Sequence, residues 1–202
     1  MQSLPTNKLY YGFPIFILGY PDQQFGANIT TCSSSYSLGN MVVFGLSSDT
    51  NAAEQIRHYR QCSLNIMGAD QMLLVEQAGF THRNAKLTTA TAYHFWKNSK
   101  IPLLDQAQVI LVIQVDSITQ VDDYTNFTGH IQYRYANDSL LENGQLQHDR
   151  LQPVLYVGDE HKRIYRFVDQ TTTNNGSYLK QARKSTKKTA LYFILLIDCS
   201  KW

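Results

Sequence analysis

Two hydroxyl-rich segments flank one apolar strand near the start of the chain. The first is Asn28-Ile-Thr-Thr-Cys-Ser-Ser-Ser35, and the second, Ser47-Ser-Asp-Thr-Asn51, opens a predicted helix. An anion at that helix start would meet unpaired backbone N–H groups, the positive end of the helix dipole and several hydroxyl donors. The same Ser and Thr residues could equally act as a helix cap and as ordinary edge-strand side chains. An anion-binding role and a structural role therefore both stay open on these residues alone.

A third segment follows the second predicted helix and adds charged side chains. Within Gly79–Lys86, the side chains of Thr81, His82, Arg83 and Lys86 could supply hydrogen bonds and positive charge to a phosphate. Judged alone, the segment is also compatible with an ordinary solvated loop.

Common signatures of phosphate-binding loops and of catalytic nucleophiles are absent. The sequence lacks G-x-G-x-x-G, G-x-x-x-x-G-K-[ST], G-x-S-x-G and H-E-x-x-H. Its six histidines never lie two or four residues apart, and Cys32, Cys62 and Cys199 never form C-x-x-C. We therefore expect no metal site and no disulfide framework, and we assign no catalytic side chain. Three such cysteines fit a reducing cytoplasm.

The composition indicates a folded domain whose polarity comes from uncharged side chains. Of the 202 residues, 17% are charged and 43% hydrophobic, and the mean hydropathy is −0.31. Ser, Thr, Asn and Gln together supply 59 residues. The apolar content argues against disorder. No apolar run approaches the ~18 residues of a membrane span, and Phe13–Leu18 is too short for a signal peptide.

The net charge of +2 conceals two regions of opposite sign. Residues 176–202 carry six Lys and Arg against one Asp, whereas residues 1–175 carry twelve basic and fifteen acidic side chains. Because the larger region is acidic, it lacks the basic face that nucleic acid requires, and nucleic-acid binding is not expected. We predict a folded domain over 1–175 and a basic, partly apolar tail of unknown role over 176–202.

Short apolar runs and period-two alternation predict strands, with two helices between them. Thr50 or Asn51 could cap a helix over Asn51–Arg60, and Gly79 would end a second helix over Asp70–Ala78. Asn143-Gly144 predicts a tight turn. Strands are expected over Phe13–Gly19, Met41–Leu46, Cys62–Met67, Val109–Val115, Phe127–Tyr135, Pro153–Val157 and Arg163–Phe167, and an extended segment over Ala27–Tyr36. The expected fold class is mainly β, an antiparallel barrel with helical insertions.

In their order and spacing, these segments resemble the flavin reductase-like family with the FMN-binding split-barrel fold, especially its flavoredoxin-like branch. The resemblance covers the chain from about Tyr10 to about Phe167. Besides the three segments above, it rests on Cys62-Ser-Leu-Asn65, Phe127-Thr-Gly129-His-Ile and the closing pair Tyr156 and Tyr165. No single motif is diagnostic, and the specificity lies in their order.

The resemblance implies a noncovalently bound FMN near the interface of a homodimer, and electron transfer from NAD(P)H to bound or free flavin. It places the isoalloxazine edge at the first segment and the phosphate at the second, with added contacts from the third. The cofactor-binding residues that it implies are Asn28, Thr30, Thr31, Cys32, Ser33, Ser34, Ser35, Ser47, Ser48, Thr50, Asn51, Thr81, His82 and Lys86. Since the flavin performs the redox chemistry, no nucleophile or metal is required.

The sequence departs from the family pattern at two places. Ser47 and Ser48 stand where many relatives carry an arginine, and Tyr124 stands where relatives often carry a histidine. Three functions remain open: an NAD(P)H-dependent flavin reductase, an FMN-binding electron carrier without NAD(P)H oxidase activity, and a barrel that has lost flavin binding and serves as an interaction module. The residues specify neither the pyridine nucleotide nor the electron acceptor.

Overall fold

A computed structural model describes residues 1–81 and 83–183 of the chain. The chain forms two compact units, Met1–Val168 and Asp169–Trp202. The first unit contains the strands and both hydrophobic clusters discussed below. In the second unit, residues 177–183 are helical. The basic residues after 183, the apolar stretch 190–197 and Cys199 lie outside the described residues.

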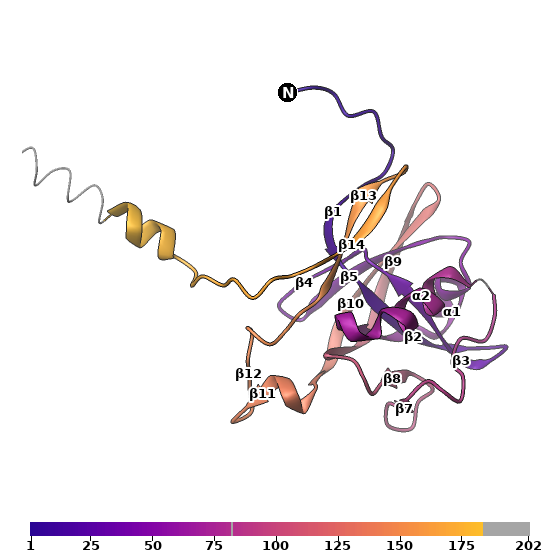
Figure 1. Ribbon diagram of the computed structural model, residues 1–202. Helices are drawn as coiled ribbons and strands as arrows, with labels where there is room; N and C mark the ends of the chain where they lie inside the picture. Colours follow the sequence, from indigo (N-terminus) through magenta and orange to yellow (C-terminus); the bar gives the residue numbers. More distant parts are fainter. Residues whose placement is uncertain (82, 184–202) are drawn as a thin grey trace, which may run out of the picture. The chain divides into compact units, whose positions relative to one another are not determined.

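A seven-stranded antiparallel sheet with the order β3-β2-β6-β9-β10-β5-β4 forms the centre of the first unit (Figure 1). Its strands are β2 (Phe16–Asp22), β3 (Gly26–Cys32), β4 (Ser35–Leu38), β5 (Met41–Ser47), β6 (Gln61–Ile66), β9 (Val109–Val121) and β10 (Tyr124–Ala136). Strands β3 and β5 are far apart in this order, yet the segment directly after β3 contacts β5: the Gly45 amide donates to the Ser34 carbonyl at 2.9 Å. The sheet is thus curled, and the predicted antiparallel, mainly β architecture is confirmed.

Smaller elements surround this sheet. They are β1 (Leu9–Pro14), α1 (Asn51–Tyr59), η1 (Ala69–Gln71), α2 (Met72–Phe80), β7 (Tyr93–Phe95), β8 (Pro102–Leu104), η2 (Asp138–Leu140), β11 (Leu141–Glu142), β12 (Gln145–Leu146), β13 (Val154–Asp159) and β14 (Arg163–Phe167). Strands β1, β13 and β14 pair into a separate small sheet. Asn143 and Gly144 join β11 to β12 with φ values of 52° and 74°, which confirms the predicted turn.

Helix α1 buries its apolar face inside the curl of the large sheet. Ile56 is fully buried in the same cluster as Phe44 and Phe127, whose rings stack with their centroids 5.1 Å apart. At the start of the helix, the Ala53 amide donates to Thr50 Oγ1 at 3.2 Å. The predicted helix and its cap are therefore confirmed, and burial of the apolar face fixes where the helix N-terminus lies.

A second apolar cluster covers the other face of the large sheet. Strand β2 is buried on both faces, since Leu18 belongs to the inner cluster and Ile17 to the outer one. In the outer cluster, Ile17 and Ile29 of the sheet lie with Val75 and Ala78 of α2. Helix α2 is thereby held against β3, which places the loop after α2 beside that strand.

Two buried polar side chains fasten three strands together. Asn65 Nδ2 donates to the Ile17 carbonyl and to Ser63 Oγ, both at 2.9 Å, while its Oδ1 accepts the Leu104 amide at 3.0 Å. Since Asn65 lies in β6, Ile17 in β2 and Leu104 in β8, the Cys62-x-x-Asn65 pattern has a structural part in this chain.

Extended structure over Phe13–Gly19 is confirmed except at Ile15, but the prediction of one unbroken strand is wrong. The chain changes sheet at Ile15, whose amide donates to the Val154 carbonyl at 2.8 Å, so that β1 ends before it and β2 begins after it. A continuous apolar run cannot reveal such a change, because the run gives no sign of which sheet each of its residues joins. The strands expected over Val109–Val115 and Phe127–Tyr135 exist but are longer, and they form one hairpin.

The predicted end of the second helix is also wrong. Helix α2 begins at Met72 after a short 3₁₀ turn and continues through Gly79 to Phe80. A Cβ at Gly79 would lie 3.3 Å from Thr31 Cβ, which is a tight contact. This glycine therefore serves the close approach of α2 to β3 and does not terminate the helix.

Candidate functional site

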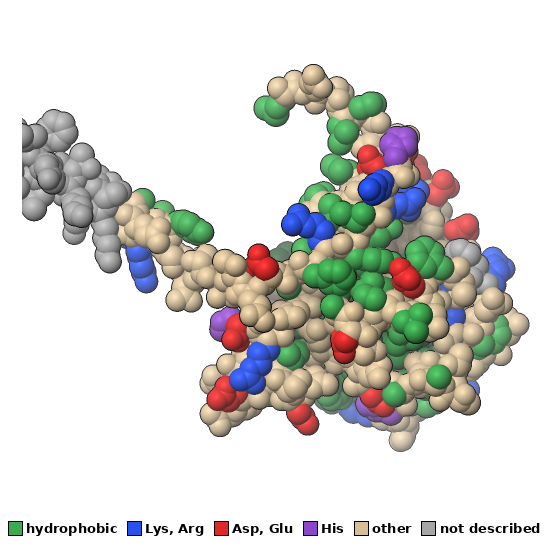
Figure 2. Space-filling model, viewed as in Figure 1, with side chains coloured by type: hydrophobic (Ala, Val, Ile, Leu, Met, Phe, Trp, Pro, Cys, Tyr) green, Lys and Arg blue, Asp and Glu red, His purple; other side chains and the backbone are tan. Residues whose placement is uncertain are grey.

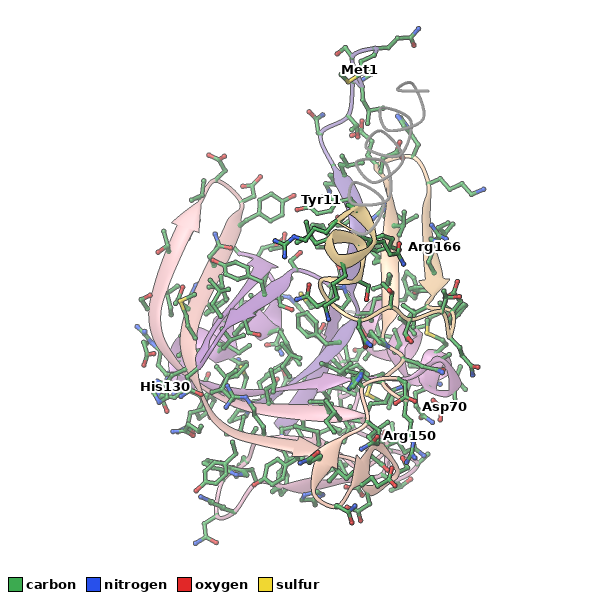
Figure 3. All side chains as sticks on the ribbon, turned by 90° about the vertical axis from the view of Figure 1, so that its left-hand side faces the viewer. Met1, Tyr11, Asp70, His130, Arg150 and Arg166 are labelled. Atoms are coloured by element: carbon green, nitrogen blue, oxygen red, sulfur yellow. The ribbon has the colours of Figure 1, made fainter. Side chains whose placement is uncertain are left out.

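A cavity of about 870 Å³ lies where β3, the end of β5, the start of α1 and the loop after α2 converge. Its volume is within the ~300–1,000 Å³ typical of small-molecule and cofactor sites. The small sheet contributes Tyr10 and Tyr156 to its border, and β10 contributes Tyr124 and Asn126. In Figure 3, the small sheet lies near the labels Tyr11 and Arg166, and the β9–β10 hairpin rises on the left of the view. Eleven of the fourteen residues expected from the sequence border this cavity: Asn28, Thr30, Thr31, Cys32, Ser33, Ser34, Ser47, Thr50, Asn51, Thr81 and Lys86.

Of the other three expected residues, Ser35 and Ser48 do not border the cavity. Ser35 begins β4 and pairs with Phe44 of β5. The Ser48 hydroxyl turns towards β10, where it lies 2.8 Å from Thr125 Oγ1. His82 lies outside the described residues. The hydroxyl-rich composition of a segment therefore does not tell which of its side chains face the cavity.

The first hydroxyl-rich segment, residues 28–35, uses several of its side chains within the protein. Asn28 Oδ1 accepts the amides of Ile29 and Lys86, both at 3.0 Å, and Asn28 Nδ2 donates to the Asn84 carbonyl. Thr31 Oγ1 donates to the Val75 carbonyl at 2.6 Å. These bonds tie β3 to α2 and to the following loop. The segment therefore offers a ligand mainly its backbone and the hydroxyls of Ser33 and Ser34, which border the cavity.

Cys32 belongs to this segment, but its environment is not that of a reactive thiol. Its Sγ donates to the Gly45 carbonyl at 3.3 Å, and burial raises the pKa of the thiol to about 11. At neutral pH the thiol stays protonated, so Cys32 packs as a small hydrophobic residue that also donates to a backbone carbonyl.

The second hydroxyl-rich segment, residues 47–51, presents the start of α1 to the cavity. Thr50, Asn51 and Ala52 all border it. The amides of Asn51 and Ala52 belong to the first turn, where N–H groups have no acceptor within the helix. Asn51 Nδ2 donates to Asp22 Oδ2 at 2.7 Å, and this bond fixes the first residue of the helix against β2. The helix start can therefore bind an anionic group through backbone donors.

Positive side chains outnumber negative ones at the cavity border. Lys8, Arg83 and Lys86 border it, against Asp49. Lys86 Nζ donates to the Ala78 carbonyl near the end of α2 at 2.6 Å and to Thr30 Oγ1 at 3.4 Å. Burial lowers the pKa of this ammonium group below its usual value of 10.5. The cavity thus favours a ligand that carries negative charge.

Four tyrosines supply the aromatic part of the lining: Tyr10, Tyr20, Tyr124 and Tyr156. The rings of Tyr10 and Tyr156 meet edge to face, with their centroids 4.9 Å apart. Tyr20 is almost fully buried, and this burial raises the pKa of its phenol, which stays protonated near neutral pH. Such rings can cover a flat ligand while their hydroxyl groups remain available for hydrogen bonds.

Sequence reasoning did not assign Lys8, Tyr10, Tyr20, Asp49 and Asn126 to the site, although all five border the cavity. Tyr10 reaches it because β1 pairs with β13, far away in the chain, and no local pattern predicts that pairing. Asp49 was within reach of the sequence, since it lies inside the Ser47–Asn51 segment.

Two features are absent from residues 1–81 and 83–183. Three or more His, Cys, Asp or Glu side chains do not gather anywhere in these ranges to hold a metal ion. Nor do the helices in these ranges include one with the length and apolar character needed to cross a bilayer.

Comparison with known proteins identifies the family. The model of the flavin reductase like domain matches residues 10–164. The chain belongs to this family. Flavoredoxin from Methanosarcina acetivorans superposes with a TM-score of 0.78 over 89% of this chain and 98% of that chain, at 16% identity. The FMN-binding protein from Thermus thermophilus, solved with bound p-hydroxybenzaldehyde, gives 0.69 over 86% and 96%, also at 16% identity.

A curated relative adds sequence similarity without a known activity. The uncharacterized protein YdfE of Bacillus subtilis is 20% identical over 191 residues, which cover 84% of this chain and 92% of that protein. Together with the family match, these similarities confirm the expected flavin reductase-like family and its split-barrel fold.

Proposed function

We propose that the cavity binds FMN noncovalently and that the chain is an oxidoreductase of the flavin reductase type, passing electrons from NAD(P)H to bound or free flavin. The observation that carries the proposal is the lining of the cavity. It combines strand-end backbone and hydroxyls, a helix N-terminus, basic side chains and tyrosines in one place. Membership of the flavin reductase like family and the names of the similar structures support the same ligand.

The donor set fits a ligand with a flat ring, a polar ring edge and an anionic end. The backbone and hydroxyls of residues 30–34 would meet the ring edge. The amides of Asn51 and Ala52, with Lys86 and Arg83, would hold the phosphate. Ser47 and Thr50 add hydroxyl donors at the same helix start. An arginine within the 47–51 loop is therefore not required, since charge comes from the loop after α2.

The residues of this chain bind and orient the ligand and exclude water from it. Bound FMN would supply the hydride acceptance and the onward electron transfer. Cys32 and Tyr20 both keep their protons near neutral pH, so neither adds a nucleophilic anion to the cavity. A lining that is rich in hydrogen-bond donors fits a protein that binds the cofactor and leaves the redox chemistry to it.

A homodimer in the cytoplasm is part of the proposal. The family resemblance supports the dimer, and hydrophobic side chains gather over α2 and the small sheet (Figure 2), among which Leu73, Phe80 and Tyr11 are exposed. Cys32 and Cys62 are both free thiols, as a reducing compartment requires. Light scattering on the purified protein would measure the assembly, and a monomeric mass would contradict it.

The test begins with the visible spectrum of the purified protein during titration with FMN. We expect a perturbed flavin band that saturates at one FMN per chain. A protein that leaves the flavin spectrum unchanged, with no FMN retained after dialysis, would overturn the proposal. Such a barrel without flavin would be the interaction module that the sequence left open.

Oxidation of NADH and NADPH with free FMN as acceptor then tests the reductase part. Turnover above that of the protein-free solution is expected with one of the two nucleotides. Tight FMN binding without any turnover would show an electron carrier and overturn the assignment of NAD(P)H as electron donor.

A further inference from the structure

Arg57, in the second turn of α1, reaches back to the loop that precedes the helix. Its Nη1 donates to the Ser48 carbonyl at 3.0 Å, and its Nη2 donates to Thr125 Oγ1 at 2.6 Å. Ser48 belongs to the 47–51 loop and Thr125 to β10, so one guanidinium joins the loop, the helix and the sheet. Arg57 itself is not among the residues that border the cavity.

The partners of Arg57 are also joined to each other. Thr125 is fully buried, and its Oγ1 lies 2.8 Å from Ser48 Oγ. The Ser48 amide donates to the Asp123 carbonyl, also at 2.8 Å. The chain neighbours of Thr125, Tyr124 and Asn126, both border the cavity. Thr125 therefore connects the 47–51 loop to the cavity-facing part of β10.

A planar guanidinium suits this place because its two acceptors lie on different elements. Arginine presents donors in a rigid fork, whereas lysine carries a single compact ammonium group. Within residues 1–81 and 83–183, the ion pairs do not include Arg57, and its described acceptors are neutral oxygens. The side chain thus acts through geometry on the loop that carries Ser47 and Thr50.

We infer that Arg57 is the positioning residue of the anion-binding end of the cavity, and that it lets this end distinguish FMN from unphosphorylated riboflavin. The inference rests on the proposed function, because it concerns the same cavity. It accounts for the serines at 47 and 48: the arginine that holds this loop comes from the helix behind it. Ring contacts at residues 30–34 lie on other elements and do not depend on Arg57.

The test compares the dissociation constants of FMN and riboflavin for the wild type, R57A and R57K, measured by fluorescence titration. We expect FMN binding to weaken on the order of tenfold in R57A, since charged hydrogen bonds are lost, while riboflavin binding stays within about twofold. R57K keeps the charge but not the fork, and we expect it to lose FMN affinity several-fold. R134A is the matched control. Arg134 Nη2 also donates to a backbone carbonyl, that of Gly39, at 2.8 Å, but neither residue borders the cavity.

Thr125 gives a second route to the same readout if the Arg57 variants do not fold. T125V removes the acceptor oxygen, whereas T125S keeps it. We expect T125V to lower the preference for FMN over riboflavin, and T125S to retain the preference of the wild type. Circular dichroism before each titration checks that the variant is folded.

Three outcomes would overturn the inference. Equal weakening of both flavins would give Arg57 a general structural role, and unchanged affinities would give it none. A wild-type FMN preference in R57K would mean that charge alone matters. A wild-type chain that binds neither flavin overturns the proposed function itself, and that result is distinguishable from the other three.

Discussion

The two hydroxyl-rich segments look alike in sequence, but the fold uses them differently. In residues 28–35, the side chains of Asn28, Thr31 and Cys32 are committed to hydrogen bonds with α2, β5 and the loop after α2. In residues 47–51, Thr50 caps α1, and Asn51 borders the cavity together with Ala52 of the same first turn. The first segment is a strand edge that is held rigid by its own side chains. The second is a helix entrance that is held from behind by Arg57.

A high content of Ser and Thr therefore indicates a segment whose backbone faces a binding cavity. It is a weaker guide to which side chains in that segment would bind the ligand. Local hydrogen bonds consume many short polar side chains. The amides that remain at a strand end or a helix start are then the donors with a fixed direction. We therefore expect changes that fill the space beside the first segment to weaken binding of the ring, and changes around the second segment to weaken binding of the phosphate. Changes to first-segment side chains that already bond the protein, such as Thr31 and Cys32, should leave flavin binding nearly unchanged.

The largest effect should come from filling the cavity beside the first segment. A Cβ at Gly45 would lie 3.2 Å from Asn126 Oδ1 and 3.7 Å from Ser34 Cβ, both from residues that border the cavity. We expect G45V to weaken FMN and riboflavin equally and by more than about tenfold, because the added methyl groups occupy the space of the ring. G45A should show the same pattern with a smaller loss, measured by the same titration. Selective loss of FMN alone would contradict the division between the two segments.

Removal of the Lys86 charge should have the next largest effect, and on FMN alone. In K86M the stem remains and the ammonium group is lost, so we expect FMN binding to fall on the order of tenfold with riboflavin unchanged. K100M, an exposed lysine outside this cavity, serves as the control. If riboflavin weakened as much as FMN, Lys86 would act on the ring and not on the anionic end.

The same lysine predicts a pH dependence. Burial lowers the pKa of Lys86, so its proton is released below the usual 10.5 as the pH rises. A bound phosphate favours the charged form, and FMN affinity should therefore decrease as the pH rises through that lowered pKa, while riboflavin affinity does not follow. In the protein without ligand, the pKa of Lys86 is lower in the folded state than in the unfolded state. The free energy of unfolding should therefore increase as the pH rises from that lowered pKa towards 10.5. Titrations of the wild type and K86M across the alkaline range would measure this, and identical FMN profiles would contradict it.

A smaller effect is expected at Thr31, where the hydroxyl binds the protein. T31V removes its bond to the Val75 carbonyl and should lower the free energy of unfolding by about 1 kcal/mol. T31S keeps the hydroxyl and should retain that part of the stability. Both flavin affinities should stay within about twofold in T31V once the protein is folded. Urea unfolding measures the first quantity, and a large loss of flavin affinity would place the Thr31 hydroxyl on the ligand.

The smallest effect is expected at Cys32. Its thiol has a pKa of about 11 and donates to a backbone carbonyl, a bond that serine can also make. C32S should keep the flavin affinity and turnover of the wild type, and iodoacetamide should react slowly with Cys32 at neutral pH. Rapid labelling accompanied by loss of flavin would assign the thiol a direct part in the site.

Much of the fold could be predicted because its signals are local. Thr50 before an amphipathic stretch predicts the start of α1, and Asn143-Gly144 predicts its turn. The break at Ile15 could not be predicted, because it depends on a bond to Val154 in a different sheet. Gly79 carried a misleading signal, since its small size serves the contact with Thr31.

The candidate site divides in the same way. The segments that contain Thr30 and Thr50 are visible in the sequence, because hydroxyl residues next to a strand and a helix form a local pattern. Tyr10 could not be assigned, since it reaches the cavity through the pairing of β1 with β13. Arg57 also escaped sequence reasoning, because nothing local predicts that a helical side chain binds a carbonyl nine residues earlier.

The most direct test of the central claim is a crystal structure of the protein with FMN. The account predicts the phosphate within hydrogen-bond distance of the Asn51 and Ala52 amides, and the polar edge of the ring against residues 30–34. A phosphate bound next to Tyr10 and Tyr156, without hydrogen bonds to the Asn51 and Ala52 amides, would contradict the account. So would a cavity without FMN in crystals grown at saturating flavin.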